Sequence, residues 1–156
     1  MGCGKTTIGR KLAVRLGYHF LDTDHQIQRE QNAKVKDLFQ IYGEEQFRHL
    51  ETDLLRRLCK LENTILATGG GILTTPGNLD LLRSIGITIY LKTDLEDICE
   101  RVSRNDRRPM LQTENPLETI QQLFGERESM YSQAEYIIET QSLKMWHIVN
   151  KIIQNL

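Results

Sequence analysis

A chain of 156 residues with a net charge of −1 is long enough to fold as one domain with a substantial core. The balanced charge excludes the extended basic face that non-specific nucleic-acid binding requires. No apolar run approaches the roughly 18 residues of a membrane span, so we expect neither nucleic acid nor a membrane as a partner. The three cysteines show no C-x-x-C spacing, which favours a cytoplasmic protein without disulfides.

The chain begins with Met1-Gly2-Cys3-Gly4-Lys5-Thr6-Thr7, which is typical of the second half of a phosphate-binding P-loop. Glycines allow backbone N–H groups to turn toward phosphate oxygens. Lys5 would place its ammonium group on the β- and γ-phosphates, and the Thr6 hydroxyl would bind Mg²⁺. The helix that follows directs its positive end at the same anion. The alternative is an ordinary glycine turn before a helix.

The first glycine of the motif G-x-x-x-x-G-K-[S/T] would fall two residues upstream of Met1, and the strand that feeds the loop would lie further upstream. We therefore expect the native protein to be longer at its N-terminus, by about ten residues that include an apolar strand.

Apolar periodicity predicts alternating helices and strands along the rest of the chain. Helices are expected over residues 8–16, 24–30, 35–60, 76–85, 94–103, 117–131 and 143–156, and strands over 18–21, 64–68, 87–91 and 136–139. This order predicts an α/β fold with a doubly wound, mostly parallel sheet flanked by helices. Residues 104–116 contain two prolines and no clear period, so a long loop is expected there.

Ligands of such sheets bind at the carboxyl ends of strands, and two clusters follow predicted strands. Asp22 and Asp24 follow the first strand; one could hold Mg²⁺ through water while the other accepts a proton from a substrate hydroxyl. Alternatively, Asp24 only caps the next helix. Gly69-Gly70-Gly71 follow the second strand, and three consecutive glycines favour close approach of a ligand to the backbone over a flexible turn.

Two groups of arginines are candidates for anion binding. Arg48 and Glu51 are three residues apart in a predicted helix and therefore neighbours. They form either an exposed ion pair or a functional pair, in which Glu51 orients the planar fork of Arg48 toward a carboxylate ligand. Arg107 and Arg108 lie in the long loop, which suits a mobile lid that adds positive charge and excludes water during phosphoryl transfer. A solvated basic loop is the alternative.

Taken together, the chain resembles the shikimate kinases, small P-loop enzymes of aromatic amino-acid biosynthesis. The matching pieces follow the family's order and span nearly the whole chain. They are Gly-Cys-Gly-Lys-Thr-Thr-Ile-Gly-Arg, Phe-Leu-Asp-Thr-Asp, Gly-Glu-Glu-Gln-Phe-Arg-His-Leu-Glu, Leu-Ala-Thr-Gly-Gly-Gly, Tyr-Leu, Arg-Arg-Pro-Met-Leu and Glu-Arg-Glu-Ser-Met-Tyr. Gluconate kinases and nucleoside-type kinases share only the P-loop and the fold.

The resemblance implies transfer of the γ-phosphate of ATP to the 3-hydroxyl of shikimate, with Mg²⁺ as cofactor. Asp24 matches the carboxylate on the reacting hydroxyl, and it is expected to be catalytic together with Lys5 and Arg108, the lid arginine on the phosphates. Asp22 and Thr6 match the residues near Mg²⁺.

The remaining site residues also follow from the resemblance. Arg48 and Arg127 match the pair that grips the shikimate carboxylate, and Gly69–Gly71 match the backbone contact to substrate. Residues 2–7 match the ATP-binding loop, and Arg101 matches a residue that packs near adenine. A small anionic polyol needs a cation clamp at one end and a carboxylate at its reacting hydroxyl, so the residues and the resemblance agree. We expect a monomer.

The chain departs from the family pattern at Cys3, where a small residue such as Ala or Ser is usual, and at Ser129-Met130-Tyr131, where Pro-Leu-Tyr is usual. Cys3 is expected to be a reactive thiol because it lies at a helix N-terminus beside Lys5. Two other functions stay open: phosphorylation of another small polyol such as gluconate, and non-catalytic binding by a kinase-derived protein.

Overall fold

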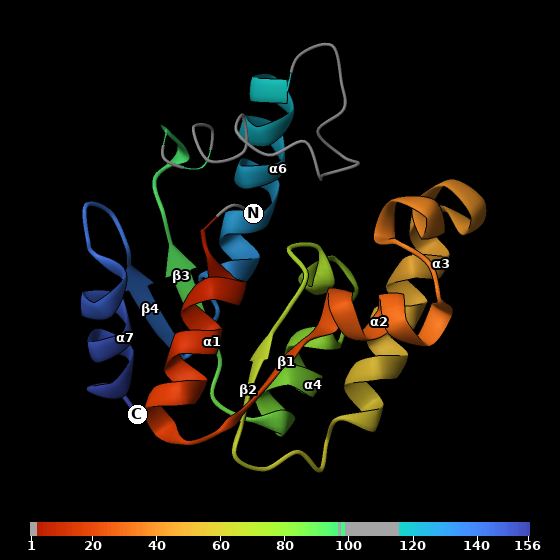
Figure 1. The fold of residues 1–156 in the computed structure, drawn as a ribbon. Helices are drawn as coiled ribbons and strands as arrows, with labels where there is room; N and C mark the ends of the chain where they lie inside the picture. The colour runs from red at the N-terminus through yellow and green to blue at the C-terminus, as the bar shows by residue number, and fades with distance from the viewer. Residues whose placement is uncertain (1–2, 97, 99–115) are drawn as a thin grey trace. The chain divides into compact units, whose positions relative to one another are not determined.

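The computed structural model describes residues 3–96, 98 and 116–156 (Figure 1). Its helices are α1 (Lys5–Leu16), α2 (Thr23–Gln31), α3 (Val35–Arg57), the short 3-10 helix η1 (Ile72–Thr74), α4 (Asn78–Ile85), α6 (Pro116–Tyr131) and α7 (Met145–Ile153). Its strands are β1 (His19–Asp22), β2 (Thr64–Ala67), β3 (Ile89–Lys92) and β4 (Tyr136–Glu139). The residues form two compact units, Lys5–Ile87 and Thr88–Leu156, the latter with the N-terminal residues up to Gly4.

In the unit Lys5–Ile87, β1 and β2 pair in parallel (Figure 1). The register sets His19 opposite Thr64 and Asp22 opposite Ala67, so both strands end at the same edge. Helix α1 packs against both strands and buries the apolar stripe that its sequence predicts, including Ile8. The residues that follow β1 and β2 are therefore neighbours in space, as the parallel arrangement requires.

Helices α2 and α3 pack side by side around a core of Ile27, Leu38, Phe47 and Leu54. The sequence predicted one helix running past Gly43, and residues on both sides of Gly43 are helical. Gly43 itself has φ 79° and ψ 172°, a conformation that glycine adopts at low cost because it has no Cβ. Helix α3 is therefore interrupted at Gly43, directly before Glu44.

The chain between β2 and α4 is held by a buried asparagine. Asn78 is fully buried; its side-chain amide donates to the Ile72 carbonyl at 2.8 Å and accepts from the Thr52 hydroxyl at 2.9 Å. The expectation that α4 begins at Pro76 is wrong. The chain first takes a left-handed turn at Gly77 (φ 86°), so that α4 begins at Asn78 and the amide reaches η1.

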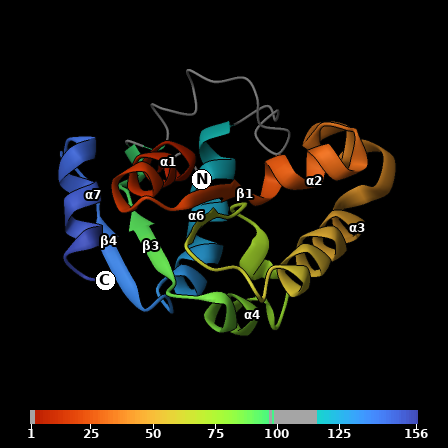
Figure 2. The same ribbon diagram turned by 60° about the horizontal axis from the view of Figure 1, so that its bottom comes forward.

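In the unit of residues 88–156, β3 and β4 pair in parallel from Ile89 opposite Tyr136 to Lys92 opposite Glu139. Helix α7 lies beside β4 (Figure 2), and buried hydroxyls of Thr93 and Thr140 hydrogen-bond at 2.7 Å beyond the strand ends. Both strand pairs of the described chain are parallel and alternate with helices, which confirms the predicted α/β class.

The predicted helix over 94–103 is described only at its start, where the Ile98 amide donates to the Asp94 carbonyl at 3.0 Å. Most of the predicted loop 104–116, with Arg107 and Arg108, lies outside the described residues, and Pro116 already belongs to α6. Within the parts that are described, no helix is long and apolar enough to cross a membrane.

Asn78→Ala should lower the free energy of unfolding by about 1–3 kcal/mol, because it leaves the buried Ile72 carbonyl without its donor. Chemical denaturation monitored by circular dichroism measures the loss. Asn155→Ala is the matched control: Asn155 also donates to a backbone carbonyl, that of Lys151, but at an exposed position, so its effect should stay within about 0.5 kcal/mol. Equal effects of the two variants would contradict the role of Asn78.

Candidate active site

The start of α1 and the end of β1 are joined by a hydrogen bond between two predicted metal ligands. The Thr6 hydroxyl donates to Asp22 Oδ2 at 2.8 Å. The other oxygen of Asp22 accepts from the His25 amide at 3.3 Å and caps α2. Asp22 is therefore the helix cap, and the alternative in which Asp24 only caps this helix is wrong. Gly4, with φ 87°, precedes Lys5 at the first position of α1.

Asp24 lies in the first turn of α2 and is half-buried. Its Oδ1 atom is buried and has no hydrogen-bond partner among the described residues. Burial and the negative charge of Asp22 raise the pKa of Asp24, while Lys5 and Arg48 oppose this rise. A buried carboxylate oxygen without a donor is costly, and a substrate hydroxyl is the kind of group that would satisfy it.

Arg48 is held by two carboxylates of its own helix. Its Nη1 pairs with Glu51 Oε2 at 2.6 Å and its Nη2 with Glu44 Oε1 at 2.7 Å. The Glu51 side chain is fully buried and Arg48 is only 12% exposed, so this pair is not the exposed ion pair that the sequence also allowed. Burial lowers the pKa of Arg48, but the ion pairs with Glu51 and Glu44 outweigh it and the net pKa is raised.

The glycines after β2 lie against these charged side chains. A Cβ atom on Gly69 would come within 2.6 Å of Asp24 Oδ1 and 2.7 Å of Glu51 Oε1, and one on Gly71 would overlap the Arg48 guanidinium. The sequence predicted close approach of a ligand to this backbone, which stays a prediction; the groups that the structure places there are side chains of this chain itself. Asp24, Glu51 and Arg48 can lie this close to the loop because the loop carries no side chains.

Two contacts of this site were not predicted from the sequence, one of the glycine loop and one of Arg48. The Gly69 amide donates to the Thr23 hydroxyl at 3.1 Å, and Thr23 is fully buried between the two aspartates. Glu44, the second partner of Arg48, was also missed as a site residue. Its spacing of four from Arg48 on a helix was a signal that could have found it.

Two other predicted site residues are buried, and three lie outside the described residues. Arg127 lies on α6 and is 5% exposed, and Cys3 is 7% exposed. Burial of Cys3 contradicts the expectation of a reactive thiol, because buried cysteines are shielded from reagents. Gly2, Arg101 and Arg108 lie outside the described residues. No cluster of three or more metal-binding side chains occurs in the described ranges.

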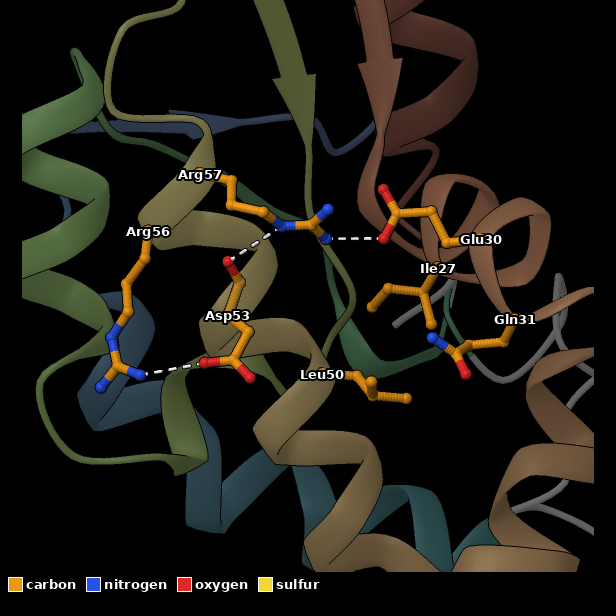
Figure 3. Close-up of a pocket in the computed structure, with 7 residues that line it drawn as sticks. All are labelled: Ile27, Glu30, Gln31, Leu50, Asp53, Arg56 and Arg57. Carbon is orange, nitrogen blue, oxygen red and sulfur yellow. Dashed lines mark hydrogen bonds and ion pairs between the residues drawn. The ribbon is translucent and has the colours of Figure 1, made fainter.

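A hollow of about 570 Å³ between α2 and α3 is lined by Ile27, Glu30, Gln31, Leu50, Asp53, Arg56 and Arg57 (Figure 3). Its charged groups pair with one another: Arg57 with Glu30 at 2.6 Å and Arg56 with Asp53 at 2.9 Å. The hydrogen bond from Arg57 lowers the pKa of Glu30. None of the predicted site residues lines this hollow. The Arg57–Glu30 pair links α3 to α2, and the Arg56–Asp53 pair lies within α3, so these charges are paired with each other rather than directed at a ligand.

Asp24→Asn should raise the melting temperature at neutral pH. A carboxyl group whose pKa is raised on folding contributes stability below its unfolded pKa, and this contribution is lost as the pH rises through the folded pKa. The ionised Asp24 therefore destabilises the protein at neutral pH, and asparagine removes that penalty.

Thermal melts from pH 8 down to pH 4 should show the difference from the parent shrinking as the pH approaches the ordinary aspartate value of 3.8. Glu45→Gln, at a side chain that is 95% exposed, is the control and should show no such trend. A lower melting temperature for Asp24→Asn at neutral pH would contradict the interpretation.

Comparison with known proteins places this geometry in a family. The family model described as shikimate kinase matches residues 1–156. The chain is 37% identical over 154 residues to a shikimate kinase of Thermoanaerobacter pseudethanolicus, covering 99% of this chain and 90% of that one. It is 43% identical over 142 residues to a shikimate kinase of Thiobacillus denitrificans, covering 90% and 77% of the two chains.

Solved structures give the same result. The structure titled shikimate kinase from Acinetobacter baumannii in complex with shikimate matches with a TM-score of 0.95 and 41% identity, covering 99% of this chain and 87% of that one. A gluconokinase from Sinorhizobium meliloti matches with a TM-score of 0.61 and 15% identity over 99% and 85% of the chains, which shows a shared fold alone. The chain belongs to the shikimate kinase family.

Proposed function

We propose that this protein transfers the γ-phosphate of ATP to the 3-hydroxyl of shikimate. The observation that carries the proposal is the buried Asp24 carboxylate, whose Oδ1 has no partner among the described residues and which lies beside the glycine loop. Membership of the shikimate kinase family supports the choice of substrate. Gluconate is a weaker candidate, because the gluconokinase match is to the fold only.

Asp24 has the properties of a general base for this reaction. Burial and the negative charge of Asp22 raise its pKa, which makes it a stronger base than an ordinary aspartate. In the proposed step, Asp24 accepts the proton of the substrate hydroxyl while the hydroxyl oxygen bonds to the γ-phosphorus. The bond from that phosphorus to the bridging oxygen breaks, and ADP leaves with the electron pair. Lys5, at the start of α1, neutralises negative charge on the phosphates.

The residues fit a magnesium ion. The Thr6 hydroxyl and Asp22 carboxylate lie within hydrogen-bond distance of each other, and Mg²⁺ in such sites takes one or two protein oxygens together with water and phosphate oxygens. When bound, Mg²⁺ withdraws charge from the β- and γ-phosphates. Asp22 is already oriented for this role, because its other oxygen is held by the His25 amide.

We propose that arginine side chains orient the two substrates. In this proposal Arg48 and Arg127 of a single kinase domain bind the shikimate carboxylate, and Arg101 and Arg108, which lie outside the described residues, contact the nucleotide. Glu51 supports the role of Arg48, because a buried carboxylate fixes the guanidinium in place and a fixed fork binds a carboxylate with both hydrogen bonds. The proposal includes a monomer that acts in the cytoplasm.

Asp24→Asn should lower kcat by about 10²–10⁴-fold, the usual loss on removal of a general base. A coupled ADP-release assay, run with shikimate, with gluconate and without acceptor, measures it. The parent should release ADP with shikimate but not with gluconate or without an acceptor. The variant should bind shikimate and ATP but release ADP slowly. Retention of more than a tenth of kcat would rule out the base, and equal ADP release with all three conditions would rule out the proposed reaction.

Gly71→Ala should raise the KM for shikimate by about 10- to 100-fold, because its Cβ would overlap the Arg48 guanidinium and a shift of about 1 Å in a binding group has effects of this size. The KM for ATP should change little. Gly86→Ala is the matched control, since nothing lies within 4 Å of a Cβ at that position, and it should keep both KM values. Steady-state kinetics with each substrate varied in turn decides between these results.

A further inference from the structure

One edge of the Arg48 guanidinium is already hydrogen-bonded in this structure to the Glu44 carboxylate, which has no role in the proposed reaction. Glu44 Oε1 accepts hydrogen bonds from both Nε (3.2 Å) and Nη2 (2.7 Å) of Arg48. These two donors form the side edge of the guanidinium, which is one of the edges that can bind a carboxylate with two parallel hydrogen bonds. Glu51 takes Nη1 at 2.6 Å. Three of the five N–H donors of the guanidinium are thus directed at the chain's own carboxylates.

The two carboxylates differ in how firmly they are held. The Glu51 side chain is fully buried, whereas that of Glu44 is 49% exposed. A buried carboxylate that lost Arg48 would bear a large desolvation cost, but Glu44 can exchange Arg48 for water at little cost. Glu44 also follows directly on Gly43, where α3 leaves helical geometry. Glu51 is therefore the permanent partner of Arg48, and Glu44 is the displaceable one.

We propose that Glu44 is an internal competitor for the substrate carboxylate at Arg48, and that it sets the affinity for shikimate. This inference rests on the proposed function, in which Arg48 binds that carboxylate. A second carboxylate brought to the same edge meets the negative charge of Glu44 and must displace it. The loop at Gly71 closes another side of the guanidinium, since even a Cβ there would overlap it, so the substrate has little room to avoid this exchange.

The test compares Glu44→Gln and Glu44→Asp with the parent. Glu44→Gln removes the competing charge and should lower the Kd for shikimate, measured by calorimetry on nucleotide-free protein, by between about two- and fivefold, the effect of one half-exposed ion pair. Glu44→Asp keeps the charge but shortens its reach, so its effect should be smaller. In kinetics the KM for shikimate should fall without a rise in kcat, and the KM for ATP should stay the same.

Two further variants separate competition from a merely structural role. Glu45→Gln is the matched control, because Glu45 is the residue next to Glu44 but its side chain is 95% exposed and lies 4.0 Å from the His49 ring nitrogen. The Kd of this variant for shikimate should equal that of the parent. Glu51→Gln should weaken binding, since it removes the partner that orients Arg48. If Glu44→Gln weakens binding as Glu51→Gln does, or leaves it unchanged, the competitor proposal is overturned.

Arg48→Lys distinguishes failure of this inference from failure of the proposed function. An ammonium group cannot replace the planar fork, so this variant should lose about 10- to 100-fold in shikimate affinity and much less in ATP affinity. If Arg48→Lys shows this loss while Glu44→Gln does not tighten binding, only the inference about Glu44 fails. If Arg48→Lys binds shikimate normally, the clamp itself is wrong, and the competitor proposal fails with it.

Discussion

Burial of negative charge beside a loop without side chains is the constraint on which the rest of this site depends. Asp24 and Glu51 both reach the space next to Gly69, and Arg48 lies against Gly71. Carboxylates removed from water need a cation, a donor or a proton. Glu51 pairs with the Arg48 guanidinium at 2.6 Å, whereas burial and the negative charge of Asp22 raise the pKa of Asp24. This difference is consistent with the proposed roles, in which Glu51 orients Arg48 and Asp24 takes up the proton.

The surrounding structure keeps these charged groups in place. The parallel register of β1 and β2 brings the residues after both strands to one edge, and the hydroxyl of Thr23 then holds the Gly69 amide. Asn78 ties the chain beyond the glycines to α3 through Thr52. Thr23, Thr52 and Asn78 are buried polar residues, and removing any one of their side chains leaves a buried hydrogen-bonding group without its partner. The loop can therefore be free of side chains and still have a defined position.

Destabilisation is concentrated where the proposed chemistry occurs, as is common for active sites. The ionised Asp24 costs stability at neutral pH, while the apolar contacts between α2 and α3 and the ion pair of Glu30 with Arg57 offset it at a distance. In the competitor proposal, Glu44 adds a second compromise. Glu44 stabilises the Arg48 side chain before the substrate binds, and it weakens substrate binding because it must be displaced. The affinity for shikimate therefore reflects how much more strongly the substrate carboxylate binds the Arg48 guanidinium than Glu44 does.

Much of the fold and several site residues followed from the sequence because their signals are local. Helical spacing located α1 and the core face of α3, and the residue types of Lys5, Thr6 and Asp22 indicated phosphate and metal chemistry through spacing along a few residues. The start of α4 was mispredicted, because Gly77 in a left-handed turn overrode the usual position of proline at a helix start. The interruption at Gly43 was missed, because helical periodicity continues on both sides.

The sequence by itself determined the alternation of helices and parallel strands, and it predicted a phosphate loop and the reactive side chains. Only the tertiary structure decided which aspartate caps a helix and which keeps an oxygen without a donor among the described residues, and that Arg48 is enclosed by Glu51, Glu44 and the glycine loop. The physical reason is that these outcomes depend on burial and on contacts between distant residues, such as Thr23 with Gly69, 46 positions apart. Residue type states what a group can bind, but the packing around it decides its charge, its partners and its remaining free donors or acceptors.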